Sequence, residues 1–203
     1  MLPKPPDPAE AAMQLAESQG MIRVRDAEDR GIHREVLRRL TEQGRLVRVA
    51  RGTYAPASSD PSTHHDLAVA ATRVPQGVVC LLSALAYHEI GTQLPYEVWM
   101  TIDRRARKPR VDQPPMRFVL ASGAALELGI ETVEIDGVSV RIYNPTKCVV
   151  DCFRYRRHVG LEVAVEALRE TLRQRRATAS EIDEYARKCR VGSVVRPYLE
   201  AVA

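Results

Sequence analysis

Several features of exported and membrane proteins are missing from this sequence. No apolar run approaches the roughly 20 residues that a membrane-spanning helix needs. The N-terminus lacks the charged and apolar regions of a signal peptide. Only four of the 203 residues are cysteines, and without an export signal so few favour the reducing cytosol over a secreted protein. We therefore expect a cytoplasmic protein that makes no contact with a membrane.

Sequence motifs of common enzymes are also missing. There is no Walker loop, no G-x-G-x-x-G and no H-E-x-x-H. His64, His65 and His88 have no serine or cysteine at a recognisable spacing. We accordingly predict no catalytic residue and no cofactor. One enzymatic alternative is a metal-dependent nuclease built on Asp103 and Asp112, although a proline interrupts that run.

A metal site is not favoured either. Cys148 and Cys152 lie four residues apart on one face of an expected helix, and His158 follows. A zinc site needs about four ligands at familiar spacings, and a second pair is absent here. The residues between and after the two cysteines are mostly apolar, so we expect both cysteines to pack in the core.

The most informative pattern in the sequence lies in residues 31–54, GIHREVLRRLTEQGRLVRVARGTY. Ile32, Val36, Leu37 and Leu40 form one apolar face at helical spacing, and the intervening residues are polar and mostly cationic. Gly44 follows as a helix stop. The segment 46–51 is short and contains β-branched residues and arginines, which predicts a strand with one solvated face.

A basic amphipathic helix followed by an arginine-bearing hairpin is typical of a winged helix-turn-helix. Such a helix enters the major groove of DNA, while the hairpin contacts phosphates. Residues 21–54 hold nine arginines against five acids, an excess equal to the net charge of +4 of the whole chain. An ordinary small domain with a solvated helix is the alternative. We predict that the DNA-binding residues are His33, Arg34, Arg38, Arg39, Arg45, Arg48 and Arg51.

These residues should have different roles. His33, Arg34 and Arg38 lie in the N-terminal half of the helix, the part that reads bases. The other four are better placed to contact phosphate. We also expect one arginine of the set to pair with Glu35 or Glu42 instead of DNA.

The fold class expected is α+β, with two domains. A winged helix-turn-helix at 1–57 contains a first helix from Ala9 to Gln19. Residues 58–63 are rich in Pro, Ser and Asp and form the linker. The second domain, 64–203, is a mixed α+β domain with a small sheet and closing helices. One closing helix has Ser180 and Asp183 spaced as a capping box.

A second basic run, DRRARKPR, lies between two expected strands of the second domain. Five cations stand against Asp103 there, and almost no apolar residue accompanies them. A mobile solvated loop is the plain interpretation. The alternative is a surface that contacts phosphate, RNA or another nucleic acid, formed by Arg104, Arg105, Arg107, Lys108 and Arg110.

Three segments resemble the AbiEi-type antitoxins, the regulatory half of type IV toxin–antitoxin systems. RLVRVARGTY at 45–54 resembles the wing of that family, SALAYHEIG at 83–91 an early helix of its second domain, and NPTKCVVD at 144–151 the motif that opens a later helix. The chain departs from the family pattern at Glu89, where glycine is usual, and at Lys147, where arginine is commoner.

The resemblance implies a repressor that binds inverted repeats in its own operator. Since one winged helix offers few base contacts, we expect two copies on the DNA. The resemblance also implies that the second domain counteracts a nucleotidyltransferase toxin without a stable complex. The five cations of the second basic run would then be the candidate antitoxicity surface. A stand-alone winged-helix regulator without a toxin remains the alternative.

Overall fold

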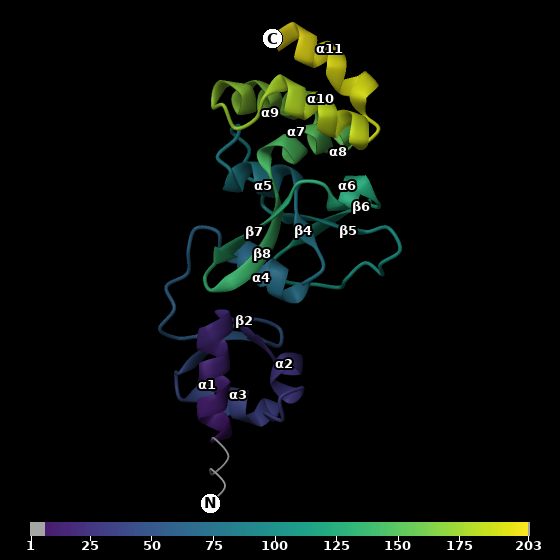
Figure 1. Ribbon diagram of the computed structural model, residues 1–203. Coiled ribbons are helices and arrows are strands. Elements are labelled where there is room, and N and C mark those ends of the chain that lie inside the picture. Colours follow the sequence, from purple (N-terminus) through teal and green to yellow (C-terminus); the bar gives the residue numbers. More distant parts are fainter. Residues whose placement is uncertain (1–6, 203) are drawn as a thin grey trace, which may run out of the picture. The chain divides into compact units, whose positions relative to one another are not determined.

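The protein is described by a computed structural model that places residues 7–202 and groups them into two compact units. The first unit holds the described residues up to Pro75 together with Val111–Pro114 and Glu134–Val140. The second holds Gln76–Arg110, Pro115–Val133 and the chain from Arg141 onward. Both units mix helices with small sheets, which confirms the α+β class (Figure 1).

The first unit contains a winged helix-turn-helix, as the sequence predicted. Its three strands form an antiparallel sheet in the order β1-β3-β2. The elements in chain order are α1 (Pro8–Gln19), β1 (Ile22–Arg23), α2 (Val24–Glu28), α3 (Arg34–Glu42), β2 (Leu46–Ala50) and β3 (Thr53–Pro56), followed by α4 (His65–Arg73).

Local sequence chemistry explains the boundaries of these elements. The Asp7 side chain caps α1 by accepting a hydrogen bond from the Ala9 amide, and Gly20 ends the helix with a φ of 68°. Leu37 and Leu40 of α3 are fully buried with Ile22 in the core. Burying a leucine contributes roughly 1.5–3 kcal/mol, so this core fixes which face of α3 points outward.

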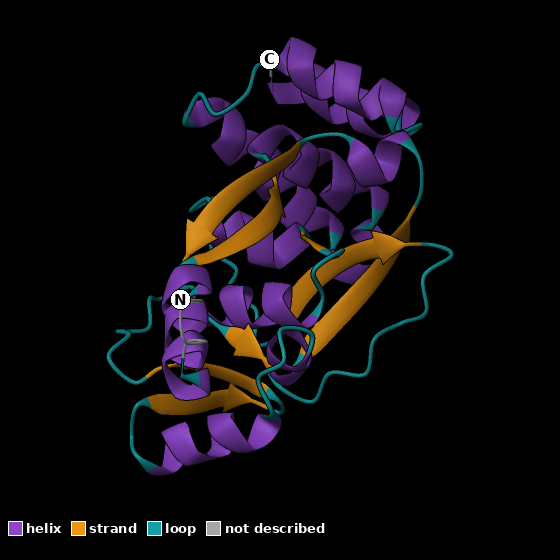
Figure 2. Cartoon of the chain, turned by 60° about the horizontal axis from the view of Figure 1, so that its bottom comes forward, coloured by secondary structure: helices purple, strands orange, loops and turns teal. Residues whose placement is uncertain are grey.

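The second unit is built around a mixed sheet in the order β6-β5-β4-β8-β7. Strands β5 and β6 are parallel, as are β4 and β8, whereas β4 and β5 are antiparallel. Figure 2 shows β5 and β6 side by side, joined by a long loop. The sheet elements are β4 (Val78–Val79), α5 (Leu81–Tyr87), β5 (Val98–Asp103), β6 (Met116–Ala121), α6 (Ala124–Glu127), β7 (Ile130–Ile135) and β8 (Val138–Tyr143).

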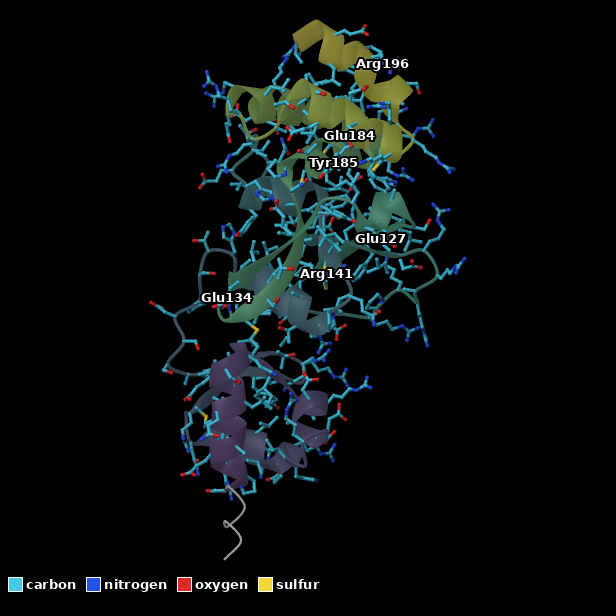
Figure 3. All side chains as sticks on the ribbon, in the orientation of Figure 1. Glu127, Glu134, Arg141, Glu184, Tyr185 and Arg196 are labelled. Carbon is cyan, nitrogen blue, oxygen red and sulfur yellow. The ribbon has the colours of Figure 1, made fainter. Side chains whose placement is uncertain are left out.

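Helices close the second unit. They are α7 (Pro145–Arg154), α8 (Arg156–Val159), α9 (Leu161–Arg173), α10 (Ala179–Lys188) and α11 (Gly192–Val202). The Asn144 side chain caps α7 by accepting a hydrogen bond from the Lys147 amide. Its Nδ2 also donates to the hydroxyl of Tyr185 at 3.3 Å; Tyr185 belongs to α10 and is labelled in Figure 3.

The capping box of α10 is not formed by the residues that the sequence suggested. Thr178 is the N-cap, and its hydroxyl and the Glu181 carboxylate satisfy each other's backbone amides. The proposed pair, Ser180 and Asp183, lies two residues further along the helix. The sequence holds both S/T-x-x-D/E patterns in succession, and the earlier pair is used because Thr178 has the extended backbone that an N-cap requires.

The two cysteines of α7 pack in the core, as the sequence predicted. Cys148 and Cys152 are both fully buried. Burial raises the pKa of both thiols far above the ordinary value, so they are poor nucleophiles and poor metal ligands. Among residues 7–202, no three His, Cys, Asp or Glu side chains are grouped so as to hold a metal ion. The same residues include no helix that is long and apolar enough to cross a membrane.

Candidate nucleic-acid interface

The N-terminus of α3 presents His33 and Arg34 to solvent. His33 is the N-cap, and its Nδ1 accepts a hydrogen bond from the Glu35 amide at 3.2 Å. With Nδ1 engaged as an acceptor, Nε2–H is the donor that the ring can offer to a ligand. Arg34 is exposed and makes no salt bridge with any other described residue. Both side chains stand at the end of the helix that recognition helices insert into the groove.

Arg38 is held by two glutamates of its own helix. Its Nη1 lies 2.5 Å from a carboxylate oxygen of Glu42, and its Nε donates to Glu35 at 2.8 Å. The hydrogen bond with Glu35 raises the pKa of the guanidinium above its ordinary value. The expectation that one arginine pairs with Glu35 or Glu42 is therefore confirmed, and Arg38 pairs with both. Contact with a base would require Arg38 to leave these partners.

Arg39 and Arg45 lie at the far end of α3 and in the turn that follows. Both side chains are exposed. The backbone carbonyl of Arg45 accepts a hydrogen bond from the Ala57 amide, so the turn is tied to the end of β3. Within the described chain neither guanidinium has an acidic partner, which leaves both free to neutralise phosphate.

The wing is the β2–β3 hairpin, and it is irregular where its arginines lie. Arg48 pairs with Tyr54, but Ala50 pairs with Thr53, so the register shifts at Val49. Such a bulge redirects the side chains of a strand. The Arg48 Nε donates to the Ala50 carbonyl at 3.4 Å, while Arg51 is exposed in the turn.

A third arginine reaches the wing from outside the hairpin. Arg73, at the end of α4, donates a hydrogen bond from Nη1 to the Arg51 carbonyl. The two residues border a cavity of about 370 Å³ whose wall comes from the hairpin, α4 and the segment 111–114; its lining residues are Arg48, Val49, Ala50, Arg51, Arg73, Asp112 and Gln113.

Sequence reasoning did not select Arg73. It lies beyond the proline- and serine-rich linker, in an alanine-rich helix that contains no other arginine or lysine. Only the fold brings the end of α4 to the hairpin. A local pattern could not have indicated this arginine, because the contact joins residues 22 positions apart in sequence.

The second basic run forms the loop between β5 and β6, and the name basic loop is used here for residues 103–110. All five cations are exposed, and none forms a salt bridge with another residue of the described chain. Asp103, the acid of the run and a residue of the nuclease alternative, instead accepts a hydrogen bond from the Arg105 amide at 2.7 Å. Lys108 Nζ lies 5.9 Å from the centre of the Phe118 ring on β6.

Comparison with known proteins relates the chain to a family and to a fold. No curated protein matches it. The crystal structure of the RV2827C protein from Mycobacterium tuberculosis is similar over 97% of this chain and 82% of that one, with a TM-score of 0.50 and 14% identity. At that identity the likeness concerns the fold alone. Residues 10–57 match the model of a family described as "Transcriptional regulator, AbiEi antitoxin". The matched segment runs from α1 through the wing, so it is the winged helix of this chain that is similar to this family of transcriptional regulators.

Proposed function

We propose that the chain represses its own operon by binding inverted repeats in the operator DNA. The observation that carries this proposal is a winged helix similar to that of the AbiEi family in which Arg34, Arg39, Arg45 and Arg51 are exposed and have no acidic partner among the described residues. Arg34 would read a base edge, since a guanidinium can donate two hydrogen bonds to guanine. The phosphate contacts would come from Arg39, Arg45, Arg48 and Arg51.

Two copies would occupy one operator. A single winged helix offers few base contacts, and a second copy on the neighbouring half-site makes the next contact effectively intramolecular. Half-sites about one helical turn apart place two recognition helices on one face of the duplex. The DNA-binding function would reside in residues 1–57 and the antitoxin function in 64–203, with 58–63 as the linker, although the first compact unit extends past this linker to Pro75.

The second domain would supply the antitoxin activity. We propose that it counteracts a nucleotidyltransferase toxin without forming a stable complex, through the cations of the basic loop. Two observations support this proposal: the family described for residues 10–57 is an antitoxin family, and the basic loop concentrates five exposed cations without acidic partners. The loop has no role in the core that would otherwise explain its composition.

Two measurements test these proposals separately. DNase footprinting on the promoter region upstream of the chain's own gene should show two protected half-sites, filled cooperatively. Growth of cells that express a neighbouring nucleotidyltransferase gene should be restored by the full chain. Protection without any rescue would indicate a stand-alone regulator. Absence of specific protection at low salt would contradict the repressor proposal itself.

A further inference from the structure

The basic loop gathers five exposed cations, and none of them has an acidic partner among the described residues. Several exposed cations on the closing helices are paired along the helix, as Arg187 is with Asp183 at 3.0 Å and Lys188 with Glu184 at 2.6 Å. The cations of the basic loop have no such neighbouring acid. Asp103, the acid of the run, instead accepts a hydrogen bond from the Arg105 backbone amide. The loop therefore presents a positive field that only an external anion can neutralise.

Beside the loop lies an edge strand with a partly exposed apolar face. Strand β6 ends the sheet, with β5 on one side and no described strand on the other. Met116, Phe118 and Leu120 alternate along β6 and so share one face. Leu120 is 42% exposed, and the other two are half-buried. The Lys108 ammonium lies over the Phe118 ring, which brings a cation of the loop to this face.

Further aromatic and basic groups adjoin the other end of the same strand. The Tyr155 hydroxyl donates to the Leu120 carbonyl at 3.0 Å, and the His158 ring lies 6.3 Å from the Tyr155 ring. Arg157, between these two residues on α8, is exposed and unpaired within the described chain. Strand β6 is thus flanked along its length by aromatic rings and cations.

We propose that the basic loop and strand β6 form a binding surface for single-stranded nucleic acid, distinct from the DNA-reading winged helix. Proteins that bind unpaired strands combine cations along the backbone with aromatic faces on which bases stack. Four of the loop's five cations are arginines, whose planar guanidinium both pairs with phosphate and stacks on bases. A duplex does not expose its base faces, so the apolar face of β6 favours an unpaired strand.

The inference gives a ligand class to the surface proposed above for antitoxin activity, but it does not depend on the existence of a toxin. RNA and single-stranded DNA share the required chemistry. A polyanion without bases, such as heparin, shares only the charge. Comparison of these ligands on the intact chain therefore separates nucleic-acid recognition from charge attraction alone.

The test is fluorescence polarisation of the full chain with labelled 20-mers of oligo(U), oligo(dT) and an operator duplex at several salt concentrations. The variant Arg104→Ala/Arg105→Ala/Arg107→Ala removes three loop charges. The control Arg169→Ala/Arg173→Ala/Arg187→Ala removes three exposed charges from helices of the same unit. We expect the loop variant to bind single strands at least tenfold more weakly and to reduce the salt slope by about two. The helix control should change binding less than twofold.

A second variant tests the role of the rings. Phe118→Leu keeps an apolar side chain but removes the aromatic face, and it should weaken binding of single strands about fivefold or more while leaving heparin binding unchanged. Stronger binding of oligo(U) than of oligo(dT) would identify RNA as the ligand, and the reverse order DNA. Equal losses in the loop variant and the helix control would overturn the proposal, as would an equal loss for the operator duplex.

Failure of this proposal can be told from failure of the repressor proposal. Arg34→Ala and Arg51→Ala should weaken operator binding without affecting oligo(U). The loop variant should keep its operator affinity within twofold and its thermal unfolding midpoint unchanged. Loss of oligo(U) binding with an intact operator complex would support two separate surfaces.

Discussion

His65 and Asp136 are in contact within the first unit, although 71 residues separate them in sequence. The Nδ1 of His65 lies 2.7 Å from a carboxylate oxygen of Asp136, and the other oxygen accepts a hydrogen bond from the Ser62 amide at 3.1 Å. Nearby, Gly20 and Gly137 approach so closely that a Cβ on Gly20 would lie 1.9 Å from the Asp136 carbonyl oxygen. The turn between β7 and β8 is therefore part of the folded first unit.

Removal of the Asp136 charge should reduce stability at neutral pH. Burial opposes ionisation of this carboxyl, but the hydrogen bonds from His65 and Ser62 outweigh it and hold the pKa below its ordinary value. A carboxyl whose pKa is lower in the folded than in the unfolded state stabilises the fold at a pH above its unfolded pKa of about 4. This stabilisation is lost as the pH falls through the folded pKa. Asp136→Asn keeps the left-handed backbone and should cost about 1–3 kcal/mol at pH 7.

The measurement is urea denaturation of both proteins between pH 3 and pH 7. The difference in the free energy of unfolding should shrink as the pH falls below about 4, where Asp136 in the unfolded chain begins to bind a proton that the folded state still excludes. A difference that stays constant over this range would show that the carboxylate charge is not the stabilising feature.

Two arginines of the winged helix should affect DNA binding in different ways. Arg51→Ala should weaken binding to all sequences alike and flatten the plot of log K against log salt by about one unit, as loss of one phosphate contact does. Arg34→Ala should instead relax the preference for one base and cost about 1–3 kcal/mol on the operator. Electrophoretic mobility shifts with operator and scrambled duplexes measure both. Proportional losses in both mutants would refute the division of roles.

Arg38 provides an internal comparison for that experiment. Because it is paired with Glu35 and Glu42, its replacement by alanine releases two carboxylates near the DNA. Arg38→Ala alone should weaken binding to all duplexes through their repulsion. The triple replacement Arg38→Ala/Glu35→Ala/Glu42→Ala should restore non-specific affinity if Arg38 neutralises the acids, and should fail to restore it if Arg38 itself contacts DNA.

Local chemistry allowed much of this fold to be anticipated. The helical face of Leu37 and Leu40 and the helix stop at Gly44 depend on residues within one or two turns of each other, so the sequence displays them directly. The Arg38 pairing with Glu35 or Glu42 follows from the same i, i+3 and i, i+4 rule.

Long-range contacts could not be anticipated in this way. The parallel pairing of β4 with β8 brings Val79 to Ile142, and no local pattern specifies which strand becomes a neighbour. Arg73 at the wing and the His65 contact with Asp136 likewise depend on the assembled fold. The basic loop was recognised from its charge, but its position beside the exposed face of β6 required the structure.

Arg73 should contribute to DNA binding although it lies outside residues 10–57. Its hydrogen bond to the Arg51 carbonyl can position the wing, and its charge can contact phosphate. Arg73→Ala should weaken binding to all duplexes about three- to tenfold, which corresponds to roughly 0.7–1.4 kcal/mol. Arg73→Lys separates the two roles: recovery of the salt slope would indicate a phosphate contact, and no recovery would indicate positioning. Affinity unchanged in Arg73→Ala would exclude both.

Helix α7 contains a buried ion pair between Lys147 and Asp151. Lys147 and Asp151 have no more than 2% of their side chains exposed, and Lys147 Nζ lies 2.5 Å from a carboxylate oxygen of Asp151 and 3.9 Å from the centre of the Tyr143 ring. The second oxygen of Asp151 is buried without a hydrogen-bond partner among the described residues. Burial raises the pKa of Asp151, and Lys147 opposes that rise.

Removal of one partner should therefore be far more harmful than removal of both. Lys147→Met leaves a buried carboxylate uncompensated and should cost about 3–5 kcal/mol, whereas Lys147→Met/Asp151→Leu should recover most of that loss because two apolar side chains can pack there. In the single variant the pKa of Asp151 should rise further. A carboxyl with a raised folded-state pKa binds more protons folded than unfolded, so the loss should be greater at pH 7 than at pH 5. Urea denaturation at both pH values measures this, and a double variant no more stable than Lys147→Met would show that the ammonium contributes through packing against Tyr143 instead of through charge compensation.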